Sequence, residues 1–535
     1  MKHDDIFRIT ARGMGAPRGD AALMGMKAFA LARMARLGLP VPPAFVLGTS
    51  LCRRCFLESE RFRKGLMGLL EVQMHWLQSV TGLGFGDPRK PLLVSVRSGA
   101  PVSMPGMLAT LLNIGLCDAT VRGMLRITGN PRLVWDSYRR LVQGFAEVVF
   151  DAAPQPFSAA MEAALARERL ERVQDLDHLS LSRLTHTYLR IFEESTGRPF
   201  PQNPLDQLGL AAQAVITSWN TPRAVEYRRL YRIADDLCTA VAVQQMVFGN
   251  AGGTSGTGVA FTRDPDSGEK RLYFDFLFNS QGEDVVSGRA AGSEAELLFP
   301  ALPESEQALL DIAAALEQEY GDAQEFEFTV QDGVLYLLQT RTAKRTPWAA
   351  LRMAVEQVEE GLIGRSEALA RLEGLTLDAI QRRRLSTEGQ EPLCRGQSAG
   401  VGVAVGPIAF DVESARRFAA EGHPAVLVRE EMTTADIAAI SLSAGVLTVR
   451  GNRTSHAAVV ARQLDKACIT GCSALRIDAT RHIAAFGKRT LGEGEALTLD
   501  SNTGRVFAGK AEIVVDLPSR WLEEIAQWRQ SSLSS

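Results

Sequence analysis

The sequence predicts a multidomain protein of the mixed α/β class, and three observations support that prediction. The chain has 535 residues, which at about 150 residues per domain corresponds to three or four domains. Hydrophobic residues make up 46% of it and charged residues 23%, as is usual for globular proteins. Short apolar runs bounded by glycine and proline alternate with amphipathic stretches, which indicates strands interleaved with helices.

The first half of the chain begins with mixed α/β patterns and then becomes helical. A helix is expected at 27–37, where Gly38 and the prolines that follow stop the pattern. The apolar run at 91–99 predicts a strand. Amphipathic stretches between 121 and 240 predict a largely helical region.

The second half returns to strands. Strand-like runs lie between 241 and 345, whereas residues 347–385 predict charged helix with no strand pattern. A polar and then glycine-rich stretch at 388–406 marks a domain boundary. A compact α/β unit is expected from 396 to about 510, and the tail at 521–535 predicts one helix that frays into serines.

Charge and cysteine usage exclude several classes of protein. A net charge of -3 gives no field that favours nucleic acid or a membrane surface. No run of 18 apolar residues predicts a membrane span, and the N-terminus lacks a signal-peptide core, so we expect a cytoplasmic protein. The seven scattered cysteines do not form a disulfide framework. Cys52 and Cys55 form a CxxC pair, but no second ligand pair follows, which favours plain thiols over zinc.

Two segments early in the chain would suit a phosphate site. Gly25, Met26 and Lys27 lie just inside a helical stretch, where a lysine and free backbone N–H groups meet phosphate oxygens. Arg97 emerges from a strand into a glycine turn, which suits a phosphate clamp. Taken singly, a lysine or an arginine in such a position is more often a surface residue.

Two later segments extend the same pattern. The glycine-rich run at 249–258 could wrap an anion with successive N–H groups, although such runs are more often turns. Glu325 and Glu327 alternate onto one face of a strand, where two carboxylates can hold Mg²⁺, although such pairs are more often a solvated face. Gln339 and Arg341 follow on the next strand. The combination of all four segments in one α/β region favours a nucleotide site.

One of the seven histidines stands out by its context. Residues 445–462 predict a strand, a glycine turn and a helix, with Thr454 or Ser455 as the N-cap and His456 in the first turn. The helix dipole and free N–H groups there would stabilise a phosphoryl group on the ring. They would also keep the imidazole neutral and nucleophilic. A capping or partly buried histidine is the plainer alternative.

Longer stretches of the chain resemble the pyruvate phosphate dikinase family over essentially its whole length. The related phosphoenolpyruvate synthases share the histidine motif but not the form SGAPVSMPGM. The matching stretches are GLPVPPAF (38–45), SVRSGAPVSMPGM (95–107), NPRLVWDSYRR (130–140), SWNTPRAVEYRRL (218–230), VQQMVFGN (243–250), GTGVAFTRDP (256–265), NSQGEDVVSG (279–288), LLQTRTAKRT (337–346) and TSHAAVVAR (454–462).

This resemblance implies an α/β multidomain fold with four parts. They are an ATP-grasp-like nucleotide-binding domain at 1–345 with a helical insert at about 121–240, a helical linker at 346–390, a swivelling α/β phosphohistidine domain at 391–512, and a C-terminal helix and tail at 513–535. The linker would act as a hinge that carries His456 between sites.

The resemblance also implies a set of site residues and a reaction. His456 would be the catalytic phosphoryl carrier, and Glu325, Glu327 and Gln339 would hold Mg²⁺. The residues expected to bind ATP are Lys27, Arg97, Gln244, Thr254, Ser255, Glu325, Glu327, Gln339 and Arg341. In the family, the β-phosphoryl group of ATP reaches the histidine through a pyrophosphoryl-enzyme, and inorganic phosphate takes the γ-phosphoryl group.

The sequence departs from the family in several places. The family ends in an (α/β)₈ barrel that needs about 250 residues, and too few follow position 510 to form one, so the partial reaction on pyruvate is not expected here. Met26 and Ala28 replace glycines beside Lys27, where larger side chains would crowd bound phosphate. Asp275 replaces a glutamate, Glu325 an aspartate, Ala109 an aspartate and Asn452 a glycine.

Three hypotheses follow. The first is an ATP-dependent phosphotransferase that phosphorylates its own His456 and passes the group to a separate pyruvate- or phosphoenolpyruvate-binding protein or to a small molecule. The second, a complete small-molecule phosphotransferase, requires a substrate domain for which no segment is spare. The third is a non-catalytic nucleotide-binding regulatory or partner-binding module, favoured by the altered turn at 25–28. The expected partners are ATP and inorganic phosphate, together with Mg²⁺. Neither nucleic acid nor a membrane is expected as a partner. The sequence leaves open whether the chain forms a homodimer.

Overall fold

The structure is a computed structural model of the chain. It describes residues 5–533 apart from 11–19, 58, 103, 105–107, 171, 235–236, 283–294, 387–390, 401, 433–435, 452–455, 465 and 479. Side chains are described for the same residues except 57, 59–64, 456–457, 459, 463 and 532–533. The predicted N-cap at Thr454 or Ser455 and the replacement at Asn452 therefore lie outside the described residues, as does most of the SMPGM segment.

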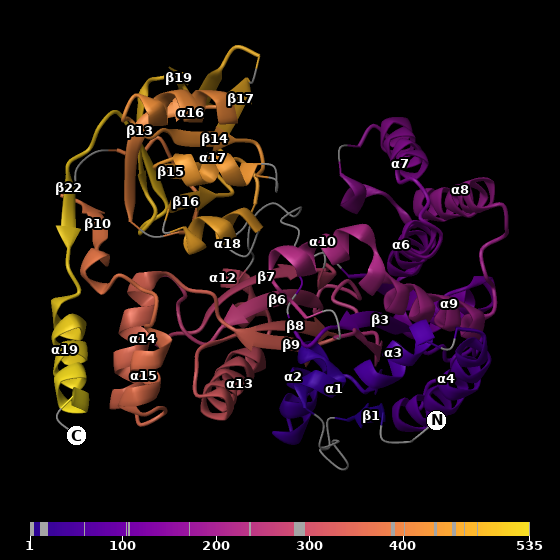
Figure 1. Cartoon of the computed structure of the whole chain (residues 1–535). Coiled ribbons are helices and arrows are strands. Elements are labelled where there is room, and N and C mark those ends of the chain that lie inside the picture. Colours follow the sequence, from indigo (N-terminus) through magenta and orange to yellow (C-terminus); the bar gives the residue numbers. More distant parts are fainter. Residues whose placement is uncertain are drawn as a thin grey trace. The chain divides into compact units, whose positions relative to one another are not determined.

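Contacts within the chain divide it into two compact units. Unit 1 comprises Met1–Gly252 and Val334–Gln339, and unit 2 comprises Gly253–Gly333 and Thr340–Ser535. Figure 1 shows a mixture of helices and sheets in both units, which agrees with the predicted mixed α/β class. The boundaries predicted after 345 and after 390 both lie inside unit 2, and the four-part division stays a prediction.

The sheet of unit 1 has five strands in the order β1-β2-β5-β3-β4, with every neighbouring pair antiparallel. The central strand β5 enters this sheet after the whole helical region, so residues far apart in sequence become neighbours. The strands are β1 (Ile6–Ile9), β2 (Ala44–Leu47), β3 (Val94–Gly99), β4 (Thr110–Ile114) and β5 (Ala240–Gln245). The early helices are α1 (Ala21–Met24), α2 (Met26–Arg36), α3 (Thr49–Leu57) and α4 (Ser59–Thr81).

The region between β4 and β5 is helical, as the amphipathic pattern predicts. Its helices are α5 (Asp118–Thr128), α6 (Pro131–Phe150), α7 (Gln155–Glu168), α8 (His178–Thr196), α9 (Pro204–Thr217) and α10 (Pro222–Leu230). α6 begins where Asn130 accepts the N–H of Leu133 and Pro131 occupies the first helical position. Its apolar face enters the large core of unit 1 through side chains such as Leu141 and Phe145.

A four-stranded sheet has the order β7-β6-β8-β9. Its first three strands belong to unit 2, whereas residues Val334–Gln339 of β9 are grouped with unit 1. The strands of this sheet are β6 (Gly256–Phe261), β7 (Tyr273–Phe278), β8 (Gln324–Gln331) and β9 (Val334–Thr342), and the helices α12 (Ala295–Ala301) and α13 (Glu304–Tyr320) lie between β7 and β8 in the chain. β6 pairs antiparallel with both β7 and β8. The strands predicted between 241 and 345 are thus confirmed.

The segment predicted as helical linker is only partly helical. It contains α14 (Pro347–Glu359) and α15 (Arg365–Arg371), but it ends in strand β10 (Arg382–Leu385). β10 pairs antiparallel with β22 (Ile513–Asp516), which precedes the predicted C-terminal helix α19 (Ser519–Leu533). The prediction of helix through 385 is therefore wrong. The arginine-rich β10 has no apolar alternation, and its strand conformation comes from the partner strand rather than from its own pattern.

The helices of this region share a small core of their own. Trp348 on α14 and Trp521 on α19 meet edge to face, with ring centroids 5.4 Å apart. Leu351, Ile525 and Trp528 are buried beside them. The C-terminal helix is therefore part of the region formed by α14 and α15 rather than a free tail.

The C-terminal α/β region is built on an eight-stranded sheet in the order β11-β21-β20-β13-β14-β15-β16-β12. Strands β13 to β16 are parallel neighbours, and the helices α16 (Val412–Ala420), α17 (Ile437–Leu442) and α18 (His456–Gln463) connect them (Figure 1). The strands of the sheet are β11 (Cys394–Arg395), β12 (Gln397–Ser398), β13 (Val403–Ala409), β14 (Val426–Arg429), β15 (Gly445–Thr448), β16 (Ala467–Thr470), β20 (Ala496–Asp500) and β21 (Arg505–Ala508). A separate three-stranded sheet consists of β17 (Leu475–Asp478), β18 (Ile483–Phe486) and β19 (Arg489–Gly492).

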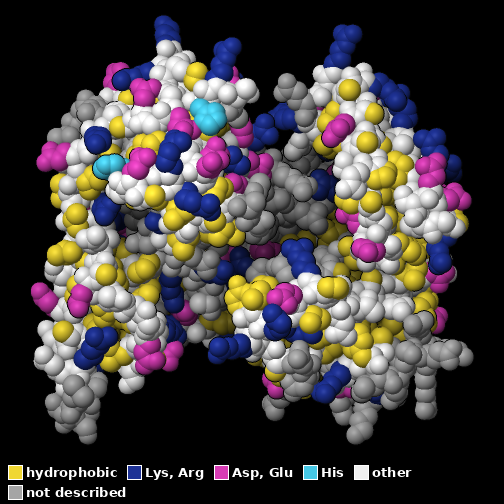
Figure 2. Space-filling view, turned by 45° about the horizontal axis from the view of Figure 1, so that its top comes forward, with side chains coloured by type: hydrophobic (Ala, Val, Ile, Leu, Met, Phe, Trp, Pro, Cys, Tyr) yellow, Lys and Arg dark blue, Asp and Glu magenta, His cyan; other side chains and the backbone are white. Residues whose placement is uncertain are grey.

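The surface carries charges of both signs. Figure 2 shows Lys and Arg side chains interspersed with Asp and Glu over the visible face, in line with the small net charge of -3. Among the described helices, none combines the length and the apolar character that a membrane crossing requires. All seven cysteine side chains are buried, and they are thiols rather than disulfides.

Candidate functional site

The first two predicted phosphate segments meet in unit 1. The N–H of Met26, the first residue of α2, donates to the carbonyl of Ala100 at 2.9 Å, just beyond the end of β3. Gly25 has a φ of 76°, and a Cβ there would lie 1.9 Å from the carbonyl oxygen of Gly99. Only glycine allows this approach. The start of α2, with exposed Lys27 as its second residue, therefore lies against the strand that carries half-buried Arg97.

The side chains that replace the family's glycines point in different directions. Met26 is 46% exposed, whereas Ala28 is buried. Ala28 thus faces the interior of unit 1, and Met26 is the larger side chain that lies at the surface beside Lys27.

Gln244 is held within unit 1. Its side chain on β5 is buried and donates from Nε2 to the carbonyl of Pro42 at 3.2 Å. Its backbone pairs with Ala44 on one side and Ser95 on the other. The described hydrogen bond of the side chain therefore fixes the turn before β2.

The composition of the glycine-rich run at 249–258 predicts a loop throughout, but its last residues belong to strand β6. Gly256 and Gly258 lie within β6, where an added Cβ would come within 2.1 Å of Phe276 and 2.5 Å of Phe328. These two glycines make room for aromatic rings rather than for an anion. The interpretation of the whole run as an anion-binding loop is therefore wrong for this part, while Gly252 and Gly253 have open space around them.

Thr254 and Ser255 hold the turn between β8 and β9. The fully buried hydroxyl of Ser255 accepts the N–H of Asp332 at 2.9 Å. The carbonyl of Thr254 accepts the N–H of Gly333 at 3.0 Å. The side chain of Thr254 is exposed, so it is the one of this pair that a bound ligand could reach.

The acidic strand and its neighbour come together as predicted. Glu325 on β8 is buried, and its carboxylate accepts a hydrogen bond from Arg341 on β9. The hydroxyl of Thr340 donates to the carbonyl of Glu325 at 3.2 Å. Glu327 is the next residue on the same face of β8 and is half-buried. Gln339 lies half-buried on β9.

Charges in this cluster act on one another. Burial alone would lower the pKa of Arg341, but the carboxylates of Glu325 and Glu327 raise it. Burial lowers the pKa of Lys344, and the positive charge of Arg341 lowers it further. Two carboxylates and two cationic side chains thus lie in one small region at the edge of the sheet.

A third carboxylate shares the face of the sheet on which Glu327 lies. Val259 on β6 is paired with Asp275 on β7 and with Glu327 on β8. Residues paired directly across a sheet project to the same side, so Asp275 and Glu327 face the same way from strands on either side of β6. Asp275 is buried.

The carboxylates of this cluster suit a Mg²⁺ ion whose remaining ligands come from the substrate. Within the described part of the chain, no three His, Cys, Asp or Glu side chains lie close enough to enclose a metal ion. Glu325 and Glu327 nevertheless provide two carboxylates on one face. Mg²⁺ in phosphoryl-transfer enzymes is typically held by one or two carboxylates together with substrate phosphates and water.

His456 is the first residue of α18, as the pattern predicts for a histidine in the first turn. The helix follows β15, whose Thr448 hydroxyl donates to the carbonyl of Arg450 at 2.6 Å. Ala458 and Ala461 on the inner face of α18 are fully buried. The backbone N–H groups at this helix start and the helix dipole favour negative charge beside His456.

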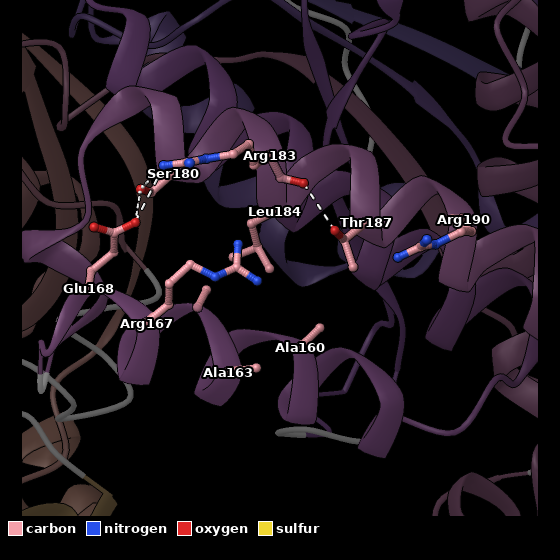
Figure 3. Close-up of a pocket in the computed structure, with 10 residues that line it drawn as sticks. Ala160, Ala163, Arg167, Glu168, Ser180, Arg183, Leu184, Thr187 and Arg190 are labelled. Carbon is pink, nitrogen blue, oxygen red and sulfur yellow. Dashed lines mark hydrogen bonds and ion pairs between the residues drawn. The ribbon is translucent and has the colours of Figure 1, made fainter.

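A hollow in the helical region of unit 1 is too small for a nucleotide. It lies between α7 and α8 and has a volume of about 170 Å³, below the roughly 300–1,000 Å³ of typical ligand pockets. Figure 3 shows Arg167 extending into it, while Glu168 accepts hydrogen bonds from Ser180 at 2.9 Å and Arg183 at 3.4 Å. None of the predicted site residues lines it.

Two family models match parts of the chain, and their ranges contain half of the ten predicted site residues. Residues 80–298 match the AMP/ATP-binding domain of pyruvate phosphate dikinase, and residues 421–504 match the mobile domain of PEP-utilising enzymes. Two separate ranges of the chain are thus similar to a nucleotide-binding domain and to a mobile domain of these two types. Arg97 and Gln244 lie in the first range and His456 in the second.

Curated relatives give the same picture. The chain is 39% identical over 510 residues to pyruvate, phosphate dikinase of Clostridium symbiosum, which covers 95% of this chain and 58% of that protein. It is 40% identical over 527 residues to the chloroplastic pyruvate, phosphate dikinase 1 of Oryza sativa subsp. japonica, covering 97% and 56%. It is 39% identical over 536 residues to pyruvate, phosphate dikinase of Rhizobium meliloti (strain 1021), covering 97% and 60%. The chain spans a little over half the length of each.

Sequence reasoning missed several residues that the structure brings to attention. Lys344 lies two residues after the end of β9, and its place in the motif LLQTRTAKRT is the signal that could have identified it. The sequence alone shows Asp275 only as a replacement, because its position on the same face of the sheet as Glu327 depends on strand register. Asp266 and Arg462 form an ion pair at 2.5 Å although they are 196 residues apart in the sequence. No local sequence pattern predicts such a contact.

Proposed function

We propose that this chain is an ATP-dependent phosphotransferase that phosphorylates its own His456 and passes the phosphoryl group to an acceptor on a partner protein or a small molecule. The observation that carries this proposal is the place of His456 as the first residue of α18, within the range matched by the mobile-domain model. The match of residues 80–298 to an AMP/ATP-binding domain supports ATP as the donor.

On the nucleotide side, we assign phosphate contacts to Lys27 and Arg97. Lys27 lies at the start of α2, where the helix dipole favours anions. A guanidinium such as that of Arg97 matches phosphate oxygens in a bidentate manner. Gln244, Thr254, Ser255 and Gln339 complete the proposed nucleotide-binding set, in an ATP-grasp-like domain.

Glu325 and Glu327 would hold Mg²⁺, with Gln339 as a further oxygen ligand. When bound, the ion neutralises charge on the phosphates and orients them for in-line attack. Arg341 keeps the carboxylate of Glu325 in place through their hydrogen bond. It also supplies a fixed positive charge at the edge of the cluster.

His456 acts as the nucleophile. Its neutral ring nitrogen attacks the β-phosphorus of ATP, an N–P bond forms, and the bond to the α-phosphate oxygen breaks with release of AMP. Inorganic phosphate then takes the γ-phosphoryl group and leaves as pyrophosphate, and His456 keeps one phosphoryl group. The N-terminal N–H groups of α18 stabilise the charge on the modified ring.

The acceptor step requires the phosphohistidine domain expected at 391–512, called the histidine domain from here on, to move. We propose that it swivels on the region formed by α14, α15 and the pair β10–β22, with a cytoplasmic location. A separate pyruvate- or phosphoenolpyruvate-binding protein is the acceptor whose chemistry matches the named relatives most closely. The activities named for those relatives belong to proteins of which this chain spans a little over half.

Labelled ATP tests this proposal. The purified chain is incubated with Mg²⁺ and ATP labelled at the β- or the γ-phosphate, with and without inorganic phosphate. We expect acid-labile label from β-labelled ATP, dependent on His456 and absent in His456→Ala. ATP binding without any label in either format would overturn the proposal and favour a non-catalytic nucleotide-binding module.

A further inference from the structure

The turn between β6 and β7 holds the carboxylate of Asp266 on a rigid backbone. The N–H of Asp266 donates to Oδ1 of Asp264 at 2.9 Å, and its carbonyl accepts the hydroxyl of Thr346 at 3.0 Å. The N–H of Ser267 also donates to Oδ1 of Asp264, at 3.1 Å. Both sides of the Asp266 peptide are therefore fixed, and its carboxylate has a defined position.

A buried arginine ties the same turn to two helices. Arg263 has no exposed side-chain surface, and its guanidinium bonds to Glu317 on α13 at 2.7 Å and to Glu360 just after α14 at 2.7 Å. A third carboxylate, from Glu356, lies 3.4 Å away. Such a network holds its members rigidly because each charge has a partner. The turn is thus part of the sheet region and does not depend on the histidine domain for its shape.

The partner of Asp266 is on the histidine helix. Arg462 lies on α18, which begins with His456, and its Nε donates to Oδ1 of Asp266 at 2.5 Å. The Arg462 side chain is 1% exposed and that of Asp266 is 10% exposed. A charge-assisted hydrogen bond between two such buried groups is strong and directional, so it fixes the orientation of α18 relative to the turn.

The surroundings of this pair are polar. The hydroxyl of Tyr273 donates to the carbonyl of Ser398 at 3.4 Å. A cleft of about 390 Å³ lies beside it, lined from the β6–β7 side by residues such as Asp264 and Arg271 and from the other side by residues such as Gly400 and Asn502. The buried apolar clusters of the sheet and of the histidine domain are separate. The contact therefore has the polar character of a reversible domain interface rather than of a shared core.

We propose that Asp266 and Arg462 form the docking contact that positions the His456 helix for phosphoryl transfer from the nucleotide. Asp266 is a positioning residue, because it acts on His456 through Arg462 and α18. The role in transfer rests on the proposed function, whereas the docking contact does not. When the domain swivels, this pair breaks, and Arg462 exchanges the carboxylate for water.

The variant Asp266→Asn tests the contact without changing any residue of the histidine domain. It removes the charge opposite Arg462 and keeps the size of the side chain. Truncation of one partner of a buried charged pair costs enough to weaken docking about 30-fold or more. Asp478→Asn is the matched control, since this exposed carboxylate lies 3.8 Å from Arg481 in the same chain.

Amide hydrogen exchange without nucleotide measures docking directly. In Asp266→Asn we expect the amides of α18 to exchange at least about tenfold faster than in the wild type, because the helix leaves the turn for part of the time. The amides of β13 and β20, inside the histidine domain, should keep wild-type rates, as should every amide in Asp478→Asn. Unchanged exchange in α18 would overturn the docking contact, and faster exchange throughout the domain would show a structural role instead.

The rate of His456 labelling from ATP measures positioning. We expect Asp266→Asn to lower the maximal rate about 30-fold with the ATP concentration for half-maximal rate unchanged, and Asp266→Glu to recover part of the rate. An equal rate in wild type and Asp266→Asn would overturn the positioning role. If the wild type takes no label, the proposed function fails, and the exchange experiment still decides the docking contact.

Discussion

Gly25 shows how a single residue sets the geometry of the candidate phosphate site. Its φ of 76° and its contact with Gly99 place the first N–H groups of α2 beside the end of β3. A β-carbon at this position would overlap the carbonyl oxygen of Gly99. The residue therefore links a local backbone conformation to the place of Lys27 and Arg97.

Gly25→Ala tests this link. We expect the substitution to lower the free energy of unfolding by about 1–3 kcal/mol from backbone strain alone, with a further loss from the overlap with Gly99. It should also weaken ATP binding, because the start of α2 must shift. Urea denaturation and isothermal titration calorimetry measure the two effects.

Gly129→Ala is the control for this prediction. Gly129 also has a positive φ, of 60°, but nothing lies within 4 Å of the position of an added Cβ. It should lose some stability and keep the ATP affinity of the wild type. Equal effects of the two substitutions would contradict the role given to Gly25.

Glu325→Gln tests the proposed magnesium cluster. The change removes a negative charge that pairs with Arg341 and that the proposed ion would also use, so the dissociation constant for ATP in the presence of Mg²⁺ should rise on the order of tenfold or more. Titration calorimetry at fixed Mg²⁺ measures it, with Asp332→Asn, an exposed carboxylate of the same hairpin, as the control. A wild-type affinity in Glu325→Gln would remove Glu325 from the site.

The individual residues differ in how well the sequence predicts them. The place of His456 in the first turn of a helix was predictable, because strand, turn and helix follow one another locally. The pairing of Glu325 with Arg341 was predictable as proximity on neighbouring strands, but not as a hydrogen bond. The pair Asp266–Arg462 was not predictable, because its members come from distant segments that only the tertiary fold brings together.

At the scale of elements, α6 combines an apolar face with a buried charged group. The carboxylate of Asp136 accepts hydrogen bonds from Arg139 at 2.5 Å and from Arg140 at 2.8 Å, all within one helix. Burial alone would raise the pKa of Asp136, but the two guanidinium groups lower it well below its usual range. The ionised carboxylate therefore stabilises the folded state at neutral pH.

Asp136→Asn should destabilise unit 1, because it leaves buried Arg139 and half-buried Arg140 without their carboxylate. We expect a loss of about 3–5 kcal/mol at pH 7. Because the folded pKa lies below the unfolded value of about 3.9, this difference should shrink as the pH falls below about 4. Urea denaturation at a series of pH values measures it.

The control for Asp136 is Asp175→Asn. Asp175 pairs with Arg172 in a largely exposed position, so its loss should leave stability nearly unchanged. A constant difference between wild type and Asp136→Asn from pH 7 down to pH 3 would contradict the assigned cause.

The elements also show where sequence patterns stop being informative. Amphipathic helices such as α6 and α8 and the apolar strand β8 carry their periodicity in their own residues, and they were predicted. β10 consists largely of arginines, and it becomes a strand only through its pairing with β22. The glycines of β6 have the composition of a loop. Glycine is needed there because the rings of Phe276 and Phe328, which come from other strands, occupy the space of a side chain.

At the scale of the whole molecule, the two matched ranges are linked by the ion pair of Asp266 and Arg462. The ranges 80–298 and 421–504 match an AMP/ATP-binding domain and a mobile domain, and long motifs made this class predictable from sequence. Contacts place residues 253–333 in one unit with residues 340–535, and the four-part division expected from the sequence stays a prediction.

The central claim is that His456 receives a phosphoryl group from ATP, and peptide mass spectrometry tests it most directly. The chain is incubated with Mg²⁺ and ATP, digested at alkaline pH, and the peptide carrying His456 is analysed before and after mild acid. We predict the added mass of one phosphoryl group, located on His456 and lost in acid. An unmodified peptide from ATP-bound protein, or a modification that survives acid on Thr454 or Ser455, would contradict the claim.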